Sequence, residues 1–482
     1  MMGACRLSLM TISLTVSFGA ALLPQLPAPD EAWSRFRGPN GSGVFEATEI
    51  PTEFGPTQNM IWRVPLPPGH SSPVLAADRI FLTAFENDTL LTVCLDRKSG
   101  SVLWRREAPR TRALYADKRN GPASPTPVTD GRAVYVFFQD FGLIAYDLNG
   151  RERWRVPLGP FTNSYGMAAS PIVVDEKVIL VCDQRVGSFM IAVGAHDGRV
   201  VWRIDRPEAK TGHSTPVLYR PKGGATELIV PGSLFLTSYS VKTGHRLWWV
   251  SGLAFEMKAT PVMGLDTIYI NGTSSNDFQD SYNRAIPTFN QLAPKYDVDA
   301  DGRFSPTEIP DELAKRLLRL LDLNSDGYLD SYEWACYRAA RASPGGLWAF
   351  RLGGRGDMTE SNVLWHYEKA VPQLPSALLY RSVLYTVSDR GIVTSFDPAS
   401  GKVIAQRRIL GAIDNYFASP VAADGKIFLV SESGKVPVLK SDGNLESLAV
   451  NDLGEMSYAT PAIADGRIYI RTWSALYCFG RR

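Results

Sequence analysis

Residues 126–154, TPVTDGRAVYVFFQDFGLIAYDLNGRERW, form one complete copy of a unit that recurs along the chain. The copy opens with Thr-Pro-Val, passes an Asp-Gly turn into an apolar strand, and continues into a second strand. It ends in a glycine turn at Gly150, with Trp154 four residues later. Self-similarity at a period of tens of residues is the sequence signature of a repeat fold.

The closing glycine and tryptophan recur as four pairs: Gly100 with Trp104, Gly150 with Trp154, Gly198 with Trp202, and Gly244 with Trp248. The opening proline recurs at intervals of mostly 41 to 54 residues, as Pro73, Pro127, Pro171, Pro216, Pro261, Pro420 and Pro461. The long interval before Pro420 holds an insertion and a degenerate unit that starts near Ser376, where Ala377 replaces the proline. Two later units lack the tryptophan, and we place Ala405 and Ser447 at its position.

Each unit offers about four short strands with turn signals between them. Strands such as residues 134–138 and 427–430 are continuously apolar, as expected for sheets that are covered on both faces. Such sheets bury both faces when they pack radially around an axis. The sequence therefore predicts an all-β fold, an eight-bladed β-propeller of four-stranded antiparallel blades, with seven blades as the alternative. We expect each tryptophan to cap the joint between neighbouring blades.

The two ends of the repeat region predict how the ring closes. The last unit, from Pro461, supplies three strands, and an outer-strand sequence with its own tryptophan, MIWRV at 60–64, precedes the first unit. We expect this N-terminal strand to complete the last blade, which leaves no open sheet edge.

The unit endings of the form Asp-x-x-(Ser/Thr)-Gly-x-x-x-Trp resemble the PQQ-like repeats of the quinoprotein dehydrogenase superfamily. That superfamily also includes the propeller lipoprotein of the outer-membrane β-barrel assembly machinery. The resemblance covers roughly residues 59–275 and 345–480, and residues 33–41, WSRFRGPNG, are similar to the opening of exported bacterial members. The repeat is specific for the fold and says little about function.

The predicted organisation has five segments. Residues 1–21 are interpreted as a signal peptide, because an uncharged run follows Arg6 and ends in small residues; a spanning helix is the alternative. Residues 22–58 form an N-terminal extension, residues 59–275 and 344–482 form the propeller, and residues 276–343 interrupt its fifth blade. We therefore expect an exported protein, periplasmic or extracellular, with no transmembrane segment after cleavage.

The insertion contains two twelve-residue stretches, DVDADGRFSPTE at 297–308 and DLNSDGYLDSYE at 322–333. Calcium takes six to eight oxygens, and EF-hand loops supply them from positions 1, 3, 5, 7, 9 and 12 around a glycine at 6. Both stretches satisfy every position, so we predict a pair of EF-hands with two Ca²⁺ sites. The predicted ligands, with backbone carbonyls at Arg303 and Tyr328, are Asp297, Asp299, Asp301, Arg303, Ser305, Glu308, Asp322, Asn324, Asp326, Tyr328, Asp330 and Glu333.

Charge supports the calcium prediction, since residues 296–333 hold ten acidic and four basic side chains, a local net charge of −6. Phe304 and Leu329, at position 8 of each loop, are predicted to form the short strand pair that joins two EF-hands. Pro294 and Pro310 shorten the flanking helices, which favours a compact structural pair over a sensor. The alternative is a pair of acidic turns that fold without metal.

The mouth of the axial channel is the second candidate site, because propellers bind ligands where the innermost strands begin. The residues three positions before each opening proline, with their neighbours, give nine candidates: His70, Tyr165, His213, Glu256, Lys258, Asn415, Tyr416, Phe417 and Tyr458. Either these residues form a small-molecule or peptide site, or they are an ordinary solvated lining.

The expected function is that of a non-catalytic binding scaffold, with a protein or peptide partner at a propeller face. The alternative, implied by the resemblance, is a PQQ- and calcium-dependent quinoprotein dehydrogenase that oxidises alcohols or sugars. Such enzymes commonly carry adjacent cysteines over the cofactor, whereas Cys94, Cys182, Cys336 and Cys478 are scattered and read as core thiols, so we do not expect PQQ. A net charge of +2 favours no nucleic-acid partner, and we expect a monomer.

Overall fold

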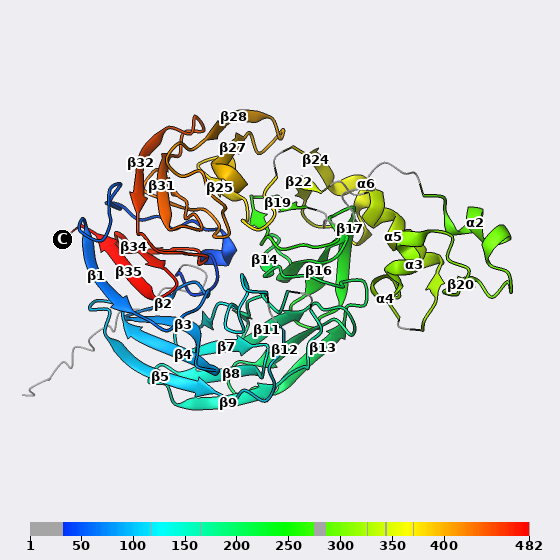
Figure 1. Cartoon of the computed structure of the whole chain (residues 1–482), viewed down its shortest axis with the longest axis horizontal. Coiled ribbons are helices and arrows are strands. Elements are labelled where there is room, and N and C mark those ends of the chain that lie inside the picture. Colours follow the sequence, from blue (N-terminus) through cyan, green and yellow to red (C-terminus); the bar gives the residue numbers. More distant parts are fainter. Residues whose placement is uncertain are drawn as a thin grey trace, which may run out of the picture.

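The computed structural model shows eight β-sheets arranged around a central axis (Figure 1). It describes residues 32–115, 117–163, 165–273, 286–324, 326–342, 345–369 and 371–481. Each blade has four antiparallel strands, and the fourth blade carries a fifth strand in parallel. The prediction of an all-β, eight-bladed propeller is confirmed.

The strands follow one another around the ring in the order of the sequence. Blade one contains β2 (Val74–Ala76), β3 (Arg79–Glu86), β4 (Thr89–Asp96) and β5 (Val102–Ala108), and blade two contains β6 (Val128–Thr129), β7 (Ala133–Phe138), β8 (Gly142–Asp147) and β9 (Glu152–Pro157). Blade three contains β10 (Ile172–Val174), β11 (Lys177–Cys182), β12 (Phe189–Gly194) and β13 (Val200–Asp205). Blade four contains β14 (Val217–Tyr219), β15 (Glu227–Pro231), β16 (Phe235–Ser240) and β17 (Arg246–Ser251), with β23 (Gly356–Asp357) beside β17. Blades five to seven contain β18 (Val262–Met263), β19 (Thr267–Gly272), β22 (Gly346–Arg351), β24 (Val363–Tyr367); β25 (Leu378–Tyr380), β26 (Val383–Ser388), β27 (Ile392–Phe396), β28 (Val403–Arg408); and β29 (Val421–Ala423), β30 (Lys426–Phe428), β31 (Lys435–Lys440), β32 (Ser447–Asp452).

The eighth blade joins the two ends of the ring. It contains β33 (Ala462–Ala464), β34 (Arg467–Arg471) and β35 (Ala475–Gly480), and its outer strand is β1 (Met60–Pro65), which pairs antiparallel with β35. The predicted closure by the N-terminal strand is therefore confirmed. The outer edge of β35 is not left open, because β1 covers it.

The outermost strand of every blade carries an irregularity beside the tryptophan position. In blade one, Cys94 pairs with Trp104 while Leu95 pairs with Val102, so one residue is left over. A bulge of this kind increases the local twist of the strand. It presents the tryptophan to the next blade.

The tryptophans lie at the joints between blades, as predicted, and the structure shows that several of them pack against the turn glycine of the next blade. Gly150 has φ +79°, and a Cβ there would lie 2.7 Å from the indole of Trp104 in the preceding blade, so only glycine fits. The Trp104 Nε1–H also donates to the carbonyl of Leu148 at 3.0 Å. The same donor bond joins Trp154 to Ala195, Trp202 to Val241, and Trp365 to Pro398.

Blades six and seven lack a tryptophan, and one sequence assignment is corrected there. Ala405 takes the tryptophan position opposite Ser395, as expected. In blade seven, however, Ala449 opposite Val438 holds that position, and Ser447 lies at the start of β32. The assignment of Ser447 was wrong because the turn before β32 is one residue longer than the turn before β5 and its glycine comes one position earlier, so Ala449 follows Gly443 by six residues rather than four.

The N-terminal extension crosses one end of the channel. The carbonyls of Trp33 and Ser34 accept hydrogen bonds from Leu75 in blade one and Thr129 in blade two. Buried Arg37 donates to the carbonyl of Ala377 in blade six at 2.8 Å, and Gly43 accepts from blade seven. The 3₁₀ helix η2 (Pro39–Gly41) lies near the centre of the ring, drawn in blue (Figure 1). The extension therefore stops the channel at this end.

The insertion lies between β19 and β22, beside the outer rim of the ring (Figure 1). Its helices are α2 (Phe289–Tyr296), α3 (Glu312–Arg316), α4 (Leu318–Leu321) and α5 (Ser331–Ala342), and α6 (Thr359–Asn362) follows after β22. The strands β20 (Arg303–Phe304) and β21 (Leu329–Asp330) pair antiparallel, with Phe304 opposite Leu329 as predicted. The two acidic stretches thus connect helices and are joined side by side.

The predicted signal peptide, residues 1–21, lies outside the described residues, as does the start of the insertion at residues 274–285. Within the described ranges, no helix has both the length and the apolar character needed to cross a bilayer. Cys94, Cys182 and Cys478 are buried free thiols, whereas Cys336 on α5 is only partly buried. Burial raises the pKa of the Cys94 and Cys336 thiols to about 12.

Candidate functional site: the axial pocket

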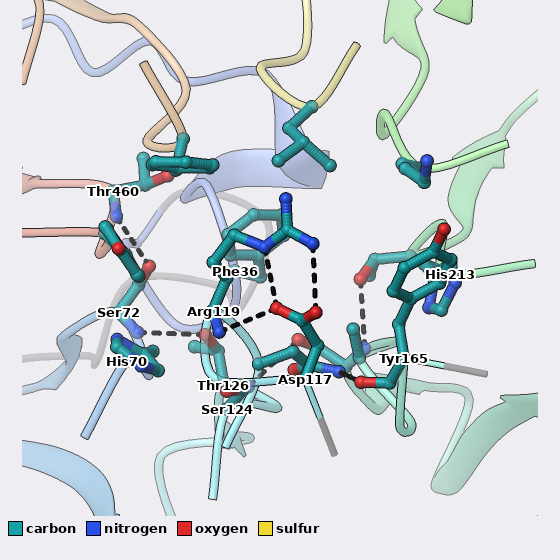
Figure 2. A pocket seen from close by; sticks show the side chains of 18 of the residues that line it. Phe36, His70, Ser72, Asp117, Arg119, Ser124, Thr126, Tyr165, His213 and Thr460 are labelled. Carbon is teal, nitrogen blue, oxygen red and sulfur yellow. Dashed lines mark hydrogen bonds and ion pairs between the residues drawn. The ribbon is translucent and has the colours of Figure 1, made fainter. Parts of the chain in front are cut away.

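The channel opens into a pocket of about 360 Å³ around the axis (Figure 2). Phe36 of the N-terminal extension lines it, together with residues of the loops that lead into the innermost strands. Because the extension stops the channel, the pocket is a cup with one entrance rather than a pore. Concave, partly apolar cavities with a few polar groups are the usual form of a ligand site.

A ring of hydroxyl groups forms the inner wall of this cup. Around most of the ring, the Ser or Thr that precedes a strand proline accepts a hydrogen bond from the backbone N–H of its counterpart in the preceding blade. These contacts, each 2.9 or 3.0 Å, run from Ser72 to Thr126, Thr126 to Ser170, Ser170 to Thr215, Thr260 to Ser376, Ser376 to Ser419, Ser419 to Thr460, and Thr460 back to Ser72. The repeated Ser/Thr-Pro step therefore ties the blades together at the axis, a role that the sequence did not reveal.

Six of the nine candidate channel residues line the pocket: His70, Tyr165, His213, Lys258, Phe417 and Tyr458. They lie in the loops that lead into the innermost strands, so the repeat register brings them together from blades distant in sequence. Glu256 lies behind this wall and forms an ion pair with Lys258, with Oε2 and Nζ 3.0 Å apart.

Asn415 and Tyr416 do not line the pocket. The side chain of Tyr416 is buried between blades six and seven, and its hydroxyl donates to the carbonyl of Ala412 at 2.8 Å. Asn415 is exposed and donates to Glu432 at 2.9 Å. Glu432 in turn accepts a 2.7 Å hydrogen bond from the hydroxyl of Tyr458, so Asn415 reaches the pocket only through Glu432.

The loop between β5 and β6 supplies polar groups that sequence reasoning missed. Arg119 binds Asp117 through two contacts, Nε to Oδ1 at 2.6 Å and Nη2 to Oδ2 at 2.9 Å (Figure 2). Asn120 donates to the carbonyl of Tyr165 at 2.9 Å, which anchors this loop across the pocket. The hydrogen bonds from Arg119 lower the pKa of Asp117 to about 2. The loop has no counterpart in the repeat, so periodicity could not place it.

Aromatic rings form a stack from the rim to the axis. His70 lies between Trp473, at a centroid distance of 5.0 Å, and Tyr458, at 4.7 Å. Phe417 contacts Tyr458 with its ring tilted by 54°, at a centroid distance of 4.5 Å. Trp473 lines a second cavity of about 650 Å³ that shares His70, Asp117 and Ser124 with the axial pocket. Together these rings give the site a rigid apolar side.

Both histidines of the pocket are held neutral. Burial lowers the pKa of His213 to about 4, and burial with the charge of Arg471 lowers that of His70 to about 4. The Nε2 atom of His213 and the Oγ atom of Ser124 are buried without a hydrogen-bond partner among the described residues. Buried polar atoms are normally hydrogen-bonded, so these two are available to a ligand.

The charged groups of the pocket are paired. Its three charged lining residues are Asp117, Arg119 and Lys258; the first two bind each other, and Lys258 binds Glu256. The site thus presents hydrogen-bonding and aromatic groups without an uncompensated charge. Such a cavity suits an uncharged ligand group.

The two acidic loops are the second place where a ligand is expected. Oxygens of Asp297, Asp299 and Glu308 lie within 4.8 Å of one another in the first loop. In both loops the carboxylate at position 1 accepts the N–H of the glycine at position 6, from Gly302 at 3.1 Å and from Gly327 at 2.9 Å. The glutamate at position 12 folds back to the N–H at position 2 in each loop. The carboxylates at positions 1 and 12 thus turn back onto their own loop in both cases, and three carboxylates of the first loop converge as a cation would require.

Comparison with known proteins agrees with this architecture. The family model described as "Outer membrane protein assembly factor BamB" matches residues 52–154, 92–275 and 342–482. No curated protein matches the chain.

Solved structures with the same fold include BamB from Moraxella catarrhalis, at 14% identity and a TM-score of 0.54, covering 88% of this chain and 99% of that one. A europium-containing methanol dehydrogenase has 10% identity and a TM-score of 0.56, covering 93% and 98%. A quinohemoprotein alcohol dehydrogenase from Pseudomonas putida HK5 has 13% identity and a TM-score of 0.57, covering 94% and 81%. These likenesses establish the propeller fold. Since the family model also matches well over half of its residues, the chain belongs to the family of the outer membrane protein assembly factor BamB.

Proposed function

We propose that the chain is an exported, calcium-binding propeller that acts as a non-catalytic binding scaffold and receives part of a protein or peptide ligand in its axial pocket. The observation that carries this proposal is the charge pairing in the pocket, where Asp117 binds Arg119 and Lys258 binds Glu256. A neutral cavity with aromatic walls accepts peptide groups and uncharged side chains without leaving a buried charge unpaired.

The free polar atoms of the pocket support a peptide ligand. His213 Nε2 and Ser124 Oγ lack partners among the described residues, and backbone amides and carbonyls of a peptide supply both kinds of partner. Trp473, with 39% of its surface exposed, extends the aromatic wall toward the rim, where more of a ligand would lie. The cup shape permits the ligand to enter from one face only.

A quinoprotein dehydrogenase is the competing function, because two of the similar structures are dehydrogenases of this fold. Pyrroloquinoline quinone is a polycarboxylate, so its site needs cations that are free to bind it. In the axial pocket both Arg119 and Lys258 are already bound to carboxylates, and the described lining residues include no tryptophan and no cysteine. The residues of this pocket do not fit that cofactor.

In the proposed function, calcium binds to the two acidic loops of the insertion. The ligands we assign are the carboxylates of Asp297, Asp299, Asp301, Glu308 in the first loop and of Asp322, Asp326, Asp330, Glu333 in the second, with Ser305, Asn324 and the carbonyls of Arg303 and Tyr328. Pairing of β20 with β21 and the shared apolar core of the helices favour a structural pair. We expect a weak affinity, of order 10⁻⁴–10⁻³ M, as in extracellular modules.

A cavity-filling variant tests the binding proposal. Peptides would be selected from a displayed library of random linear sequences on the wild-type protein in calcium. We expect Ala168→Trp, which fills the pocket, to weaken the selected peptides by about tenfold or more, since they lose their space. The control Ala399→Trp changes an exposed turn and should bind as the wild type does.

Two results would overturn the proposal. Equal peptide binding by the wild type and Ala168→Trp would remove the axial pocket as the binding site. A bound absorbance band together with dye reduction, after addition of pyrroloquinoline quinone and calcium, would replace the scaffold by a dehydrogenase.

A further inference from the structure

We infer that Lys210 links the second calcium loop to one wall of the axial pocket, so that calcium binding orders the pocket. The inference rests on the proposed calcium sites and adds a regulation of the proposed binding site. Lys210 is then a positioning residue, which acts on the pocket through the chain segments that it holds.

Lys210 belongs to the propeller but binds the insertion. It lies in the segment between β13 and β14, and only 2% of its surface is exposed. Its Nζ atom donates to the carbonyl oxygens of Asp322 at 2.9 Å and Leu323 at 3.4 Å, which are positions 1 and 2 of the second loop. A buried ammonium group needs such partners, because its desolvation is costly.

An apolar contact accompanies this polar one. Leu234 and Phe255 of the propeller belong to the same buried cluster as Phe304, Leu329 and Trp334 of the insertion. Close-packed clusters transmit displacements because they contain few voids. The insertion is therefore packed against two propeller segments besides the one that contains Lys210.

Backbone hydrogen bonds join these segments to the pocket wall. Leu234 and the segment 253–254 exchange two of them, at 3.1 and 3.2 Å. The N–H of His213 donates to the carbonyl of Met257 at 2.9 Å, and His213 and Lys258 line the pocket. His213 follows Lys210 by three positions, and Lys258 follows Phe255 by three. Lys210 and Phe255, which contact the insertion, are thus each one short step along the chain from a residue of the pocket wall.

Calcium binding to the second loop would act on the pocket wall through these contacts. The second loop holds Asp322, Asp326, Asp330 and Glu333 within twelve residues, and without a cation the repulsion between their carboxylates loosens the loop. Lys210 and the shared cluster then lose a fixed partner. Binding of calcium removes the repulsion, and the segments 207–213 and 252–258 become more protected from local opening.

Hydrogen exchange of the full-length protein, followed by mass spectrometry with calcium or with chelator, tests this link without any pocket ligand. We expect calcium to slow exchange about tenfold in peptides that cover residues 207–213 and 252–258. Glu333→Gln should remove the slowing in both segments. Lys210→Met should remove it there but leave the calcium-dependent slowing within residues 326–342. Lys242→Met, at an exposed position, is the control and should behave as the wild type.

The outcomes separate the link from the calcium sites themselves. If calorimetry shows no calcium binding, the proposed calcium sites fail and the link fails with them. If calcium binds but slows exchange only within residues 286–342, the link alone is wrong. The link is also wrong if Lys210→Met keeps the slowing in residues 207–213 and 252–258. Should Lys210→Met not fold, the comparison of wild type with Glu333→Gln decides the question.

Discussion

The axial pocket and the pair of acidic loops are both polar, yet the charges are paired in the pocket and are mostly negative in the loops. In the pocket Asp117 and Lys258 each have a partner of opposite charge, and both histidines are held neutral. Residues 296–333, which contain both loops and the helices between them, hold ten acidic and four basic side chains. Arg303, which contacts Asp301 at 2.9 Å and Asp326 at 3.2 Å, offsets only part of that excess. The charges of the pocket are paired with one another, whereas the loops keep an excess of acidic side chains, which is why we propose calcium there.

The largest expected effect concerns the calcium affinity of the two loops, and it tests the contrast between the loops and the pocket. Glu308→Gln and Glu333→Gln each remove the charge of the residue that closes a loop, so we expect affinity at that loop to fall about 100-fold, or about 2.7 kcal/mol. The propeller should remain folded, since its blades are joined by contacts outside the insertion. Isothermal titration calorimetry gives the affinity and circular dichroism the fold.

Glu312→Gln is the matched control, because Glu312 is an exposed acid on α3 outside both loops. It should titrate as the wild type does. Unchanged affinity in both loop variants would show that the acidic excess does not serve calcium.

The second expected effect concerns the stability of the fold at acid pH, because the pocket contains a histidine that is held neutral. The pKa of His213 is lowered from 6.5 to about 4, chiefly by burial, with Glu256 and Lys258 facing it. Between these two values the unfolded state binds more protons, so stability falls as pH drops from about 6.5 to 4. We expect His213→Asn to reduce the loss of unfolding free energy between pH 7.5 and 4.5 by about 2 kcal/mol.

Urea denaturation at both pH values measures that loss. The control His245→Asn changes an exposed histidine and should keep the wild-type dependence. An unchanged dependence in His213→Asn would mean that the pocket does not hold this histidine neutral.

The smallest effect comes from the ion pair over the pocket. Arg119→Met leaves Asp117 without its cation, and we expect a loss of about 1 kcal/mol at pH 7, kept small because 44% of the Arg119 side chain is exposed. The lowered pKa of Asp117 means that its contribution is present above about pH 3.8 and lost as pH falls through about 2. In Arg119→Met this loss should largely disappear, because the pKa of Asp117 is then no longer lowered by Arg119. The double variant Asp117→Asn, Arg119→Met should recover part of the stability; equal stability of all three proteins would show that the pair is not a stabilising contact.

The two sites also differ in how far the sequence could predict them. The acidic loops are contiguous, so twelve residues specify their turn and their ligands together. The blades repeat, so the recurring pattern alone was enough to assign Trp104 to a blade joint, whereas its contact with Gly150 of the next blade became visible only in the structure. Tyr416 differs, because its neighbour Phe417 turns toward the axis while Tyr416 packs between blades. Adjacent residues of an extended chain point in opposite directions, and their order in sequence does not say which faces inward.

Other features depended on contacts that no local pattern contains. Asp117 and Arg119 lie in a loop outside the repeat, and the N-terminal extension acquires its role from five blades at once. The hydroxyl ring had a visible signal, the repeated Ser/Thr before proline, but its meaning needed the circular arrangement of the blades. Lys210 carries no motif, and only the packed structure places it on the second acidic loop.

The pairing of β1 with β35 has a consequence for biogenesis. A chain made from its N-terminus releases residues 60–65 early, yet their partners at 475–480 are the last to emerge. During synthesis, residues 60–65 therefore remain without their strand partner until almost the whole chain has been made. Contacts between residues so far apart in the sequence make folding slow. Only molecules with a closed propeller would then accumulate, provided that a chaperone shields this strand and that proteases degrade chains that stop short of residue 475.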